Sequence, residues 1–199
     1  MNSLMSKPNL THGCIIMASG AGTRFGGNKL MAKLGGMPLV EHVLRATEGQ
    51  FAARVVVTRH ADVAQLARGA GALVVLHDEP YRSDTVALGM DALPACDTVT
   101  FFQGDQPLIS AASVAALLRA AESDRGAIWR ASFEGTAAAP VLFPAWAFDE
   151  LRHLPPRKGG GYVAKMHPER VRTIEVASPW ELFDVDTPED LQVLQAHLK

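Results

Sequence analysis

A segment near the start of the chain combines glycine residues with two cationic side chains. Residues 17–29 read Met-Ala-Ser-Gly-Ala-Gly-Thr-Arg-Phe-Gly-Gly-Asn-Lys and follow the apolar run of residues 14–16. Glycine lacks a Cβ and adopts positive φ readily, so successive backbone N–H groups of such a loop can turn toward one bound group. Arg24 adds a fork of donors and Lys29 adds a point charge. The pattern predicts a loop that follows a buried strand and holds a polyphosphate.

Two better-known glycine loops match this segment less well. A P-loop ends in Gly-Lys followed by Ser or Thr, whereas Leu30 follows Lys29 here. A dinucleotide fingerprint counted from Gly20 places Phe25 where the third glycine belongs. A plain glycine-rich turn between a strand and a helix is the structural alternative.

An acidic residue follows a second apolar run. Residues 97–103 predict a buried strand, and the turn Gly-Asp-Gln-Pro at residues 104–107 comes directly after it. A carboxylate at that point, Asp105, faces the same edge of the sheet as the glycine loop and can bind Mg²⁺. The alternative is an aspartate that only stabilises its own turn.

A second acidic cluster lies near the C-terminus, at residues 184–190. Alternation along an extended segment places Asp184 and Asp186 on one face, while Thr187 can cap a helix that has Pro188 at its first position. Capping accounts for Thr187 but not for the two aspartates. They are either solvated carboxylates or further metal ligands.

Two other segments carry candidate ligands. Residues 81–85 open a predicted helix with Ser83 or Asp84 as N-cap, so Ser83 and Thr85 either cap this helix or contact a base or phosphate. Residues 155–165 are glycine-rich and basic, which fits either a site for an anionic acceptor or a mobile surface loop.

The elements that must position these residues alternate between strand and helix. We expect strands over residues 14–16, 54–58, 73–76, 97–103, 127–133, 137–143 and 171–176, and helices over 39–49, 62–68, 81–93, 110–121, 144–154 and from 188 onward. Alternation favours parallel strands with ligands at their carboxyl ends, whereas the short turn at residues 134–135 makes the sheet mixed. The expected architecture is α/β with a mostly parallel mixed sheet.

Composition and length limit which kinds of partner, domain organisation and location the chain can have. The chain has 199 residues and a formal net charge of −2, which gives no footprint for nucleic acid. We expect a flexible tail over residues 1–12 and a single domain over 13–199. No secretory signal or membrane-length apolar run is evident, which points to the cytoplasm. The sequence shows no Ser/His or Cys/His constellation, and its histidines lack zinc-type spacing.

The glycine-rich segment resembles the signature L-x-A-G-x-G-T-R-x-G-x-x-K of nucleoside-triphosphate transferases with a glycosyltransferase-A-like fold. Within them the chain is most similar to the MobA-like branch, the molybdenum-cofactor cytidylyl- and guanylyltransferases. The resemblance implies a three-layer α/β/α Rossmann-like nucleotidyltransferase fold. It also implies that Asp105 and Asp186 hold Mg²⁺ or Mn²⁺, because they match the family's metal-binding turn and its D-x-D-T-P-E-D motif. Arg24 and Lys29 would complete the catalytic set.

The same resemblance assigns roles to the other candidates. The implied nucleotide-binding residues are Ala18, Ser19, Gly20, Gly22, Thr23, Arg24, Lys29, Ser83 and Thr85. The acceptor-binding residues would be Arg157, Lys158 and Lys165. The family's cytidylyltransferases tend to read G-D-x-G-A-R near this last patch, and this chain lacks that acid.

The resemblance also implies an activity, the transfer of a nucleoside monophosphate to a phosphorylated acceptor with release of pyrophosphate. Ser19 stands where members preferring CTP have Ala and those preferring GTP have Gly, which favours CTP. Molybdopterin is then the expected acceptor, with a molybdoenzyme or its maturation factor as the protein partner. The alternatives are guanylyl or cytidylyl transfer to another phosphorylated acceptor, such as methylerythritol phosphate or a sugar phosphate, and a module that binds a nucleotide or cofactor without turnover.

Overall fold

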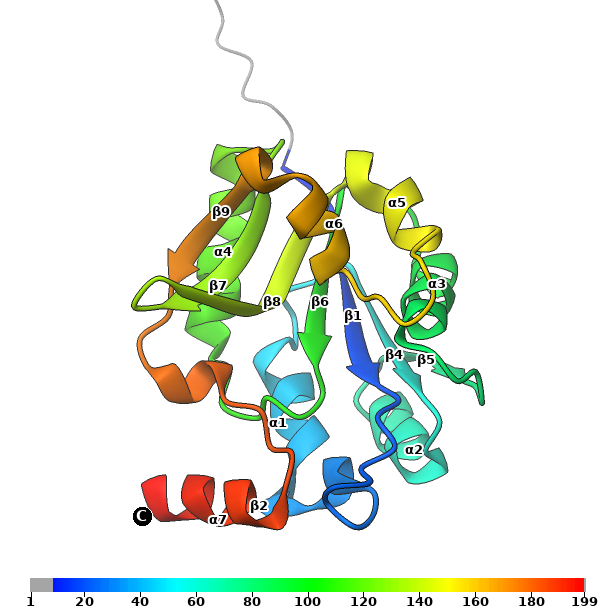
Figure 1. Ribbon diagram of the computed structural model, residues 1–199, viewed down its shortest axis with the longest axis vertical. Coiled ribbons are helices and arrows are strands. Elements are labelled where there is room, and N and C mark those ends of the chain that lie inside the picture. Colours follow the sequence, from blue (N-terminus) through cyan, green and yellow to red (C-terminus); the bar gives the residue numbers. More distant parts are fainter. Residues whose placement is uncertain (1–8, 199) are drawn as a thin grey trace, which may run out of the picture.

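The computed structural model describes residues 9–198, which form one seven-stranded sheet with helices on both faces (Figure 1). The strand order is β5-β4-β1-β6-β8-β7-β9. The strands span His12–Ala18 (β1), Ala53–Thr58 (β4), Leu73–Leu76 (β5), Thr98–Gln103 (β6), Ile128–Phe133 (β7), Thr136–Pro144 (β8) and Val171–Glu175 (β9). Only β8 runs antiparallel to its neighbours, so the sheet is mixed and mostly parallel, as expected.

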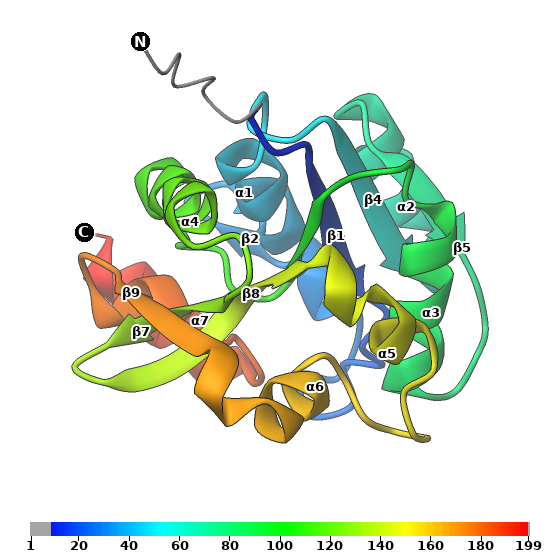
Figure 2. The same cartoon turned by 90° about the horizontal axis from the view of Figure 1, so that it is seen from above.

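Helices cover the two faces of the sheet as separate layers (Figure 2). One layer holds α1 (Leu39–Ala46), α2 (Ala61–Gly69) and α4 (Ala111–Ser123). The opposite layer holds α3 (Arg82–Ala92), α5 (Phe148–Arg152) and α6 (Gly161–Met166). The last helix, α7 (Pro188–His197), lies at the end of the molecule toward which β1 and β6 point.

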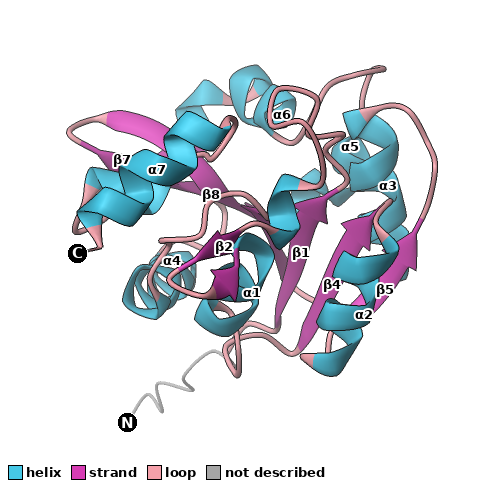
Figure 3. Cartoon of the chain, turned by 90° about the horizontal axis from the view of Figure 1, so that it is seen from below, coloured by secondary structure: helices cyan, strands magenta, loops and turns pink. Residues whose placement is uncertain are grey.

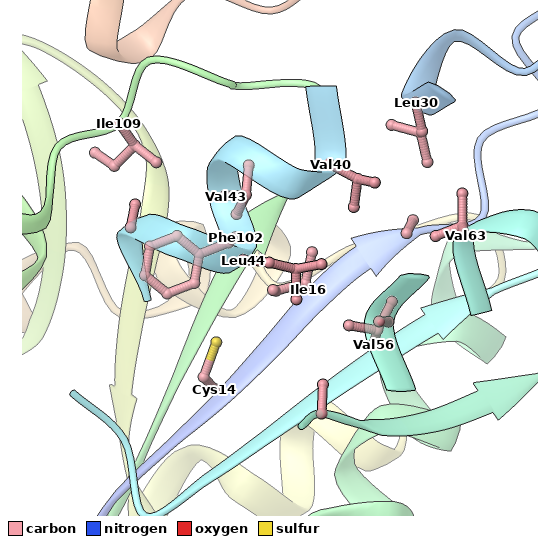
Figure 4. Close-up of a cluster of buried hydrophobic side chains, with 14 of the residues drawn as sticks. Cys14, Ile16, Leu30, Val40, Val43, Leu44, Val56, Val63, Phe102 and Ile109 are labelled. Carbon is pink, nitrogen blue, oxygen red and sulfur yellow. The ribbon is translucent and has the colours of Figure 1, made fainter. Parts of the chain in front are cut away.

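Strand β1 divides the core into two parts because successive side chains of a strand point to opposite faces. Cys14 and Ile16 are fully buried beneath α1 and α2, next to Phe102 of β6 (Figure 4). Ile15 is equally buried on the other face, against Val86 and other residues of α3. A central strand buried on both faces explains why residues 14–16 are uniformly apolar.

The predicted elements agree with the structure except at some boundaries. Ser110 caps α4, as its hydroxyl accepts from Ser113 N at 3.1 Å, and Thr187 caps α7, accepting from Asp190 N at 3.2 Å. The prediction of Ser83 or Asp84 as N-cap of α3 was wrong. The helix begins at Arg82, so Asp84 is its third residue, and its carboxylate reaches back to Tyr81 N at 3.1 Å.

Two further segments differ from expectation. The helix expected over 144–154 is shorter, because Pro144 still belongs to β8 and a 3-10 turn (Ala145–Ala147) precedes α5. The basic segment 155–165 is partly helical, since α6 begins at Gly161.

The beginning of the described chain is held in place. The tail was expected over residues 1–12, of which 1–8 lie outside the described residues. Leu10 N donates to Glu122 Oε1 at 2.5 Å, Thr11 N donates to Asp97 Oδ2 at 2.7 Å, and His12 opens β1. Between residues 9 and 198, no helix combines the length and apolar character needed to cross a membrane.

The C-terminal helix is attached to a small hairpin that the sequence did not indicate. Strands β2 (Lys33–Leu34) and β3 (Met37–Pro38) pair antiparallel, and α7 lies beside β2 (Figure 3). Leu34, Leu39, Val185 and Leu194 are fully buried together at this junction. This small core brings residues near 186 to the edge of the sheet where β1 and β6 end.

Candidate active site

A cavity of about 390 Å³ opens at the carboxyl ends of β1, β4 and β6. Its lining contains most of the glycine loop together with charged residues from four other segments. These residues are Met17, Ser19, Gly20, Ala21, Gly22, Thr23, Arg24, Lys29, Leu30, Arg59, Pro80, Tyr81, Arg82, Thr85, Gln103, Asp105 and Asp186. The loop and the two carboxylates that the sequence analysis singled out therefore share one cavity.

The second half of the glycine loop closes on its own backbone. The N–H groups of Phe25, Gly26 and Gly27 donate to Gly22 O at 3.0, 3.0 and 3.3 Å. Gly22 has φ +61°, and a Cβ there would lie 1.9 Å from Gly27 O, so only glycine fits. These amides are used inside the loop, which leaves residues 19–24 to face the cavity.

Two histidines hold the first half of the loop. Ser19 Oγ donates to Val57 O at 3.0 Å and lies 2.7 Å from His77 Nε2. Because His77 Nδ1 accepts from Glu79 N at 3.1 Å, the Nε2–H tautomer follows, and His77 donates to Ser19. His60 Nε2 lies 2.9 Å from Gly20 O and donates to this carbonyl. Both histidines position the loop, and no local sequence pattern predicts either contact.

The contact between Ser19 and His77 differs from a nucleophile with its general base. In that arrangement the imidazole nitrogen facing the serine is the acceptor, whereas here it is the donor. Burial lowers the pKa of His77, and the nearby Arg59 guanidinium lowers it further, which favours the neutral ring. No Ser/His pair was expected, yet Ser19 and His77 lie within hydrogen-bond distance of each other. This histidine nevertheless has the wrong tautomer to act as the general base of a nucleophilic serine.

A compact charge cluster connects the loop with the two carboxylates. Lys29 Nζ lies 2.6 Å from Asp105 Oδ2 and 2.8 Å from Asp186 Oδ1, and Arg24 Nη2 lies 2.8 Å from Asp186 Oδ2. Burial by itself would lower the pKa of Lys29, but its hydrogen bonds to both carboxylates outweigh burial and raise it. The hydrogen bond from Lys29 and the charge of Arg24 lower the pKa of Asp186.

Asp184 differs from its neighbour. Although it is an exposed residue outside the cavity lining, desolvation of its carboxyl and the charges of Asp105 and Asp186 raise its pKa to about 6. Val185 between the two aspartates is fully buried. Of this pair, Asp186 is the one that contacts Lys29.

The donor set suits a hard cation such as Mg²⁺ or Mn²⁺. Asp105 and Asp186 both contact Lys29 Nζ, so their carboxylates already lie around one small positively charged group, the ammonium of this lysine. Within residues 9–198, no three His, Cys, Asp or Glu side chains form a metal cluster. A metal here would thus take its remaining oxygens from phosphates and water, as Mg²⁺ commonly does.

Three other predicted nucleotide ligands lie in different surroundings. Ala18 is buried in β1, outside the cavity lining, and its carbonyl accepts from Thr58 Oγ1 at 2.8 Å. Ser83 is buried outside the lining, with its hydroxyl 3.4 Å from Asp84 Oδ1. Thr85 lines the cavity, although its hydroxyl bonds to Tyr81 O at 3.4 Å.

The basic segment 155–165 contributes its glycines to a second cavity. This cavity, of about 70 Å³, is lined by Gly159, Gly160, Gly161, Val86, Phe101, Ala139, Val141, Phe143, Met17, Arg82 and Gln103. The last three also line the larger cavity, so the two spaces are adjacent. A Cβ on Gly159 would lie 2.8 Å from Arg82 Cδ, which shows how closely this segment approaches Arg82.

The predicted acceptor-binding cations lie outside both cavities. Arg157 stacks on the ring of Tyr81, 5.4 Å from its centroid, and so reaches the rim of the larger cavity. Lys158 and Lys165 line neither space. Arg82, by contrast, borders both cavities.

Several other lining residues were not predicted from the sequence, notably Arg59, Tyr81 and Gln103. Arg59 follows β4 directly and donates to Glu79 O at 2.9 Å, while its Nε is buried without a partner in the described part of the chain. Position alone could have identified Arg59, because it follows a parallel strand at the edge where the glycine loop lies.

Comparison with known proteins gives a consistent picture. Residues 14–171 match the family model described as MobA-like NTP transferase domain. A 3-deoxy-manno-octulosonate cytidylyltransferase of Alkalilimnicola ehrlichii is 40% identical over 119 residues, which cover 56% of this chain. The match covers 46% of that enzyme, so the chain spans less than half the length of this relative.

Solved structures share the fold over nearly the whole chain. Rv0371c of Mycobacterium tuberculosis H37Rv has a TM-score of 0.81 and 20% identity, with 94% of this chain and 98% of that one covered. Rv0371c has also been solved in complex with manganese. A CMP:2-keto-3-deoxy-manno-octonic acid synthetase complexed with CTP has a TM-score of 0.75 and 18% identity, with 94% and 98% covered. At these identities the likeness shows the nucleotidyltransferase fold and no more.

Proposed function

Because the chain belongs to the MobA-like NTP transferase family, we propose that it transfers a nucleoside monophosphate from a triphosphate to an acceptor and releases pyrophosphate. One observation carries this proposal. Lys29, Asp105 and Asp186, which are far apart in sequence, meet within hydrogen-bond distance beside the glycine loop. A structural turn would not need this cluster of charges in a cavity.

The triphosphate would lie along residues 19–24, with Arg24 and Lys29 on its phosphates. The ion pairs of both cations with Asp186 support this proposal, because phosphate charge could replace or join those carboxylate partners. Mg²⁺ or Mn²⁺ held by Asp105 and Asp186 would supply charge neutralisation at the reacting phosphate. The acceptor oxygen attacks the α-phosphorus in line, and the cations stabilise the charge on the leaving pyrophosphate.

The acceptor would enter through the second cavity. Arg82 borders both spaces, so its guanidinium can hold an anionic group of the acceptor next to the α-phosphate. Molybdopterin is our first candidate for this acceptor, and a molybdoenzyme or its maturation factor would then receive the product. A sugar acid is the second, because the relative named above is a 3-deoxy-manno-octulosonate cytidylyltransferase.

CTP is the proposed donor. Ser19 is larger than the glycine of GTP-preferring members, and its hydroxyl is held by Val57 and His77 rather than free to rotate. The cytidylyltransferase relative supports the same base.

The direct test measures pyrophosphate release with each of the four triphosphates, Mg²⁺, and molybdopterin or the sugar acid as acceptor. We expect release with CTP and one acceptor, and none without the acceptor. Tight binding of nucleotide without release under any combination would favour the module that binds without turnover.

A further inference from the structure

Two segments that carry the site carboxylates run side by side in opposite directions. Residues 105–110 follow β6, and residues 181–186 precede α7. Val185 N donates to Asp105 O at 3.0 Å, at the end where Asp105 and Asp186 lie. Gln106 Nε2 donates to Leu182 O at 3.2 Å further along. The segments are thus connected at successive points away from the cavity.

Glu181 makes the connection at the far end. Its side chain is buried, with the residue only 5% exposed, and both oxygens are used. Oε2 accepts from Ser110 N at 2.9 Å, and Oε1 accepts from Ala177 N at 3.1 Å. A buried carboxylate is costly unless hydrogen bonds compensate, so these two bonds fix the start of α4 against residues 177–182.

The hydrogen bonds between residues 105–110 and 181–186 affect the candidate active site because they lie next to Asp105 and Asp186. Gln106 is 3% exposed and adjoins Asp105, while Val185 is fully buried and adjoins Asp186. The carboxylates of Asp105 and Asp186 therefore have little freedom to move apart while the hydrogen bonds of Gln106 and Glu181 are intact. A displacement of about 1 Å in a reacting constellation can lower a rate roughly 100-fold.

We propose that Glu181, together with Gln106, is a positioning residue that sets the separation of Asp105 and Asp186. This inference rests on the proposed function, since it concerns the metal and phosphate site of that reaction. Glu181 lies outside the cavity lining and acts through the backbone of the two segments.

The first experiment compares Glu181→Gln with a matched control, Glu175→Gln. Glu175 also accepts two hydrogen bonds, from Ser132 Oγ at 2.7 Å and Glu134 N at 3.0 Å, but at the β7–β9 end of the sheet. We measure Mn²⁺ binding in the presence of a non-hydrolysable CTP analogue, then kcat and KM for CTP. Loss of such indirect support typically costs about 10- to 100-fold in metal affinity or activity.

We expect E181Q to weaken Mn²⁺ binding about 10-fold or more and to lower kcat more than it raises KM. The control should keep both values. A purely structural role would instead lower the melting temperature and leave metal binding and kcat of the folded fraction unchanged, which would overturn the proposal. If E181Q does not fold, Gln106→Met removes the neighbouring tie at similar volume, and the same measurements decide.

A second measurement separates this inference from the proposed function. Hydrogen exchange of the metal-free protein should show faster exchange at residues 182–187 in E181Q than in the wild type, with no such change in E175Q. If the wild-type protein binds no Mn²⁺ and releases no pyrophosphate, the proposed function fails, yet the exchange result still reports on the tie. Unchanged exchange in this segment would refute the positioning role.

Discussion

At the scale of single residues, the site combines positions that sequence can reveal with positions that it cannot. Asp105 and Lys29 stand in recognisable local patterns next to predicted strands. The support for the loop by His60 and His77 depends on residues brought together from the ends of β4 and β5. No local pattern marks such a histidine, because its partner is set by the packing of strands distant in sequence.

Gly22 is the residue whose replacement should disturb the loop most. A Cβ at this position would lie 1.9 Å from Gly27 O, and φ is +61°. We expect Gly22→Ala to destabilise the protein by about 1–2 kcal/mol from backbone conformation alone, with a further loss from the clash. We also expect it to weaken triphosphate binding at least about 10-fold.

Gly27→Ala is the matched control for this prediction, because no atom lies within 4 Å of a Cβ at Gly27. Chemical denaturation and nucleotide titration measure the two effects. Equal behaviour of the two variants would show that the closed turn on Gly22 O is not what holds the triphosphate loop.

Ser19 offers a test of base selection. Replacement by glycine removes the hydroxyl held by Val57 and His77 and enlarges the space beside the loop. We expect Ser19→Gly to lower kcat/KM for CTP about 10-fold and to raise that for GTP, so that the ratio of the two changes by more than either value. An unchanged ratio would place base selection elsewhere in the cavity.

At the scale of elements, periodicity predicted nearly every strand and the longer helices. Those elements bury a continuous face, and burial leaves a pattern in the sequence, as for residues 14–16 of β1. The hairpin of β2 and β3 could not be found in this way, because two residues per strand carry no period. The path of residues 155–160 could not be predicted from periodicity either, because it depends on the close approach of Gly159 to Arg82.

Because of His12, at the start of β1, we expect the free energy of unfolding to depend on pH. His12 Nδ1 lies 2.6 Å from Thr98 Oγ1 at the edge of the buried sheet. Burial lowers the pKa of His12, and Arg125 acts in the same direction, whereas Glu122 and Asp97 oppose it. The unfolded chain thus binds this proton more readily than the folded one, and stability falls as the pH drops below the unfolded pKa of about 6.5.

We expect the free energy of unfolding of His12→Asn to fall less than that of the wild type between pH 7 and about pH 5, where the unfolded histidine takes up its proton. Urea titrations at several pH values measure the difference between the two proteins. A steeper fall in the variant would mean that Glu122 and Asp97 dominate and that the sign given above is wrong.

At the scale of the whole molecule, the site exists only when distant parts of the chain are in place. The cavity lining extends from Met17 to Asp186, and α7 must pack on the β2–β3 hairpin to bring Asp186 there. The turn at residues 134–135 predicted the pairing of β7 with β8. The position of β8 beside β6 and that of β9 beside β7 were not predictable, since no local sequence signal marks these partners. Nucleotide binding should therefore stabilise the entire fold.

We expect CTP with Mg²⁺ to raise the melting temperature more than the other triphosphates do, and CTP without metal to have a smaller effect. A ligand at 100 times its Kd adds about 2.7 kcal/mol, which corresponds to roughly 5–10 °C for a chain of this size. Differential scanning fluorimetry measures the shifts. Equal shifts with all four triphosphates would contradict the choice of base but not the site.

The central claim is that Asp105 and Asp186 together hold one divalent ion beside the triphosphate loop, and a double-mutant cycle on Mn²⁺ binding tests it. The control is Asp97→Asn, which replaces a carboxylate next to the opposite end of β6. With a non-hydrolysable CTP analogue present, we expect one Mn²⁺ per chain in the wild type and in D97N. D105N and D186N should each weaken binding at least 10-fold, and the double variant should lose much less than the product of the two single losses. Losses that multiply, or a single variant that binds as the wild type does, would contradict a shared ion.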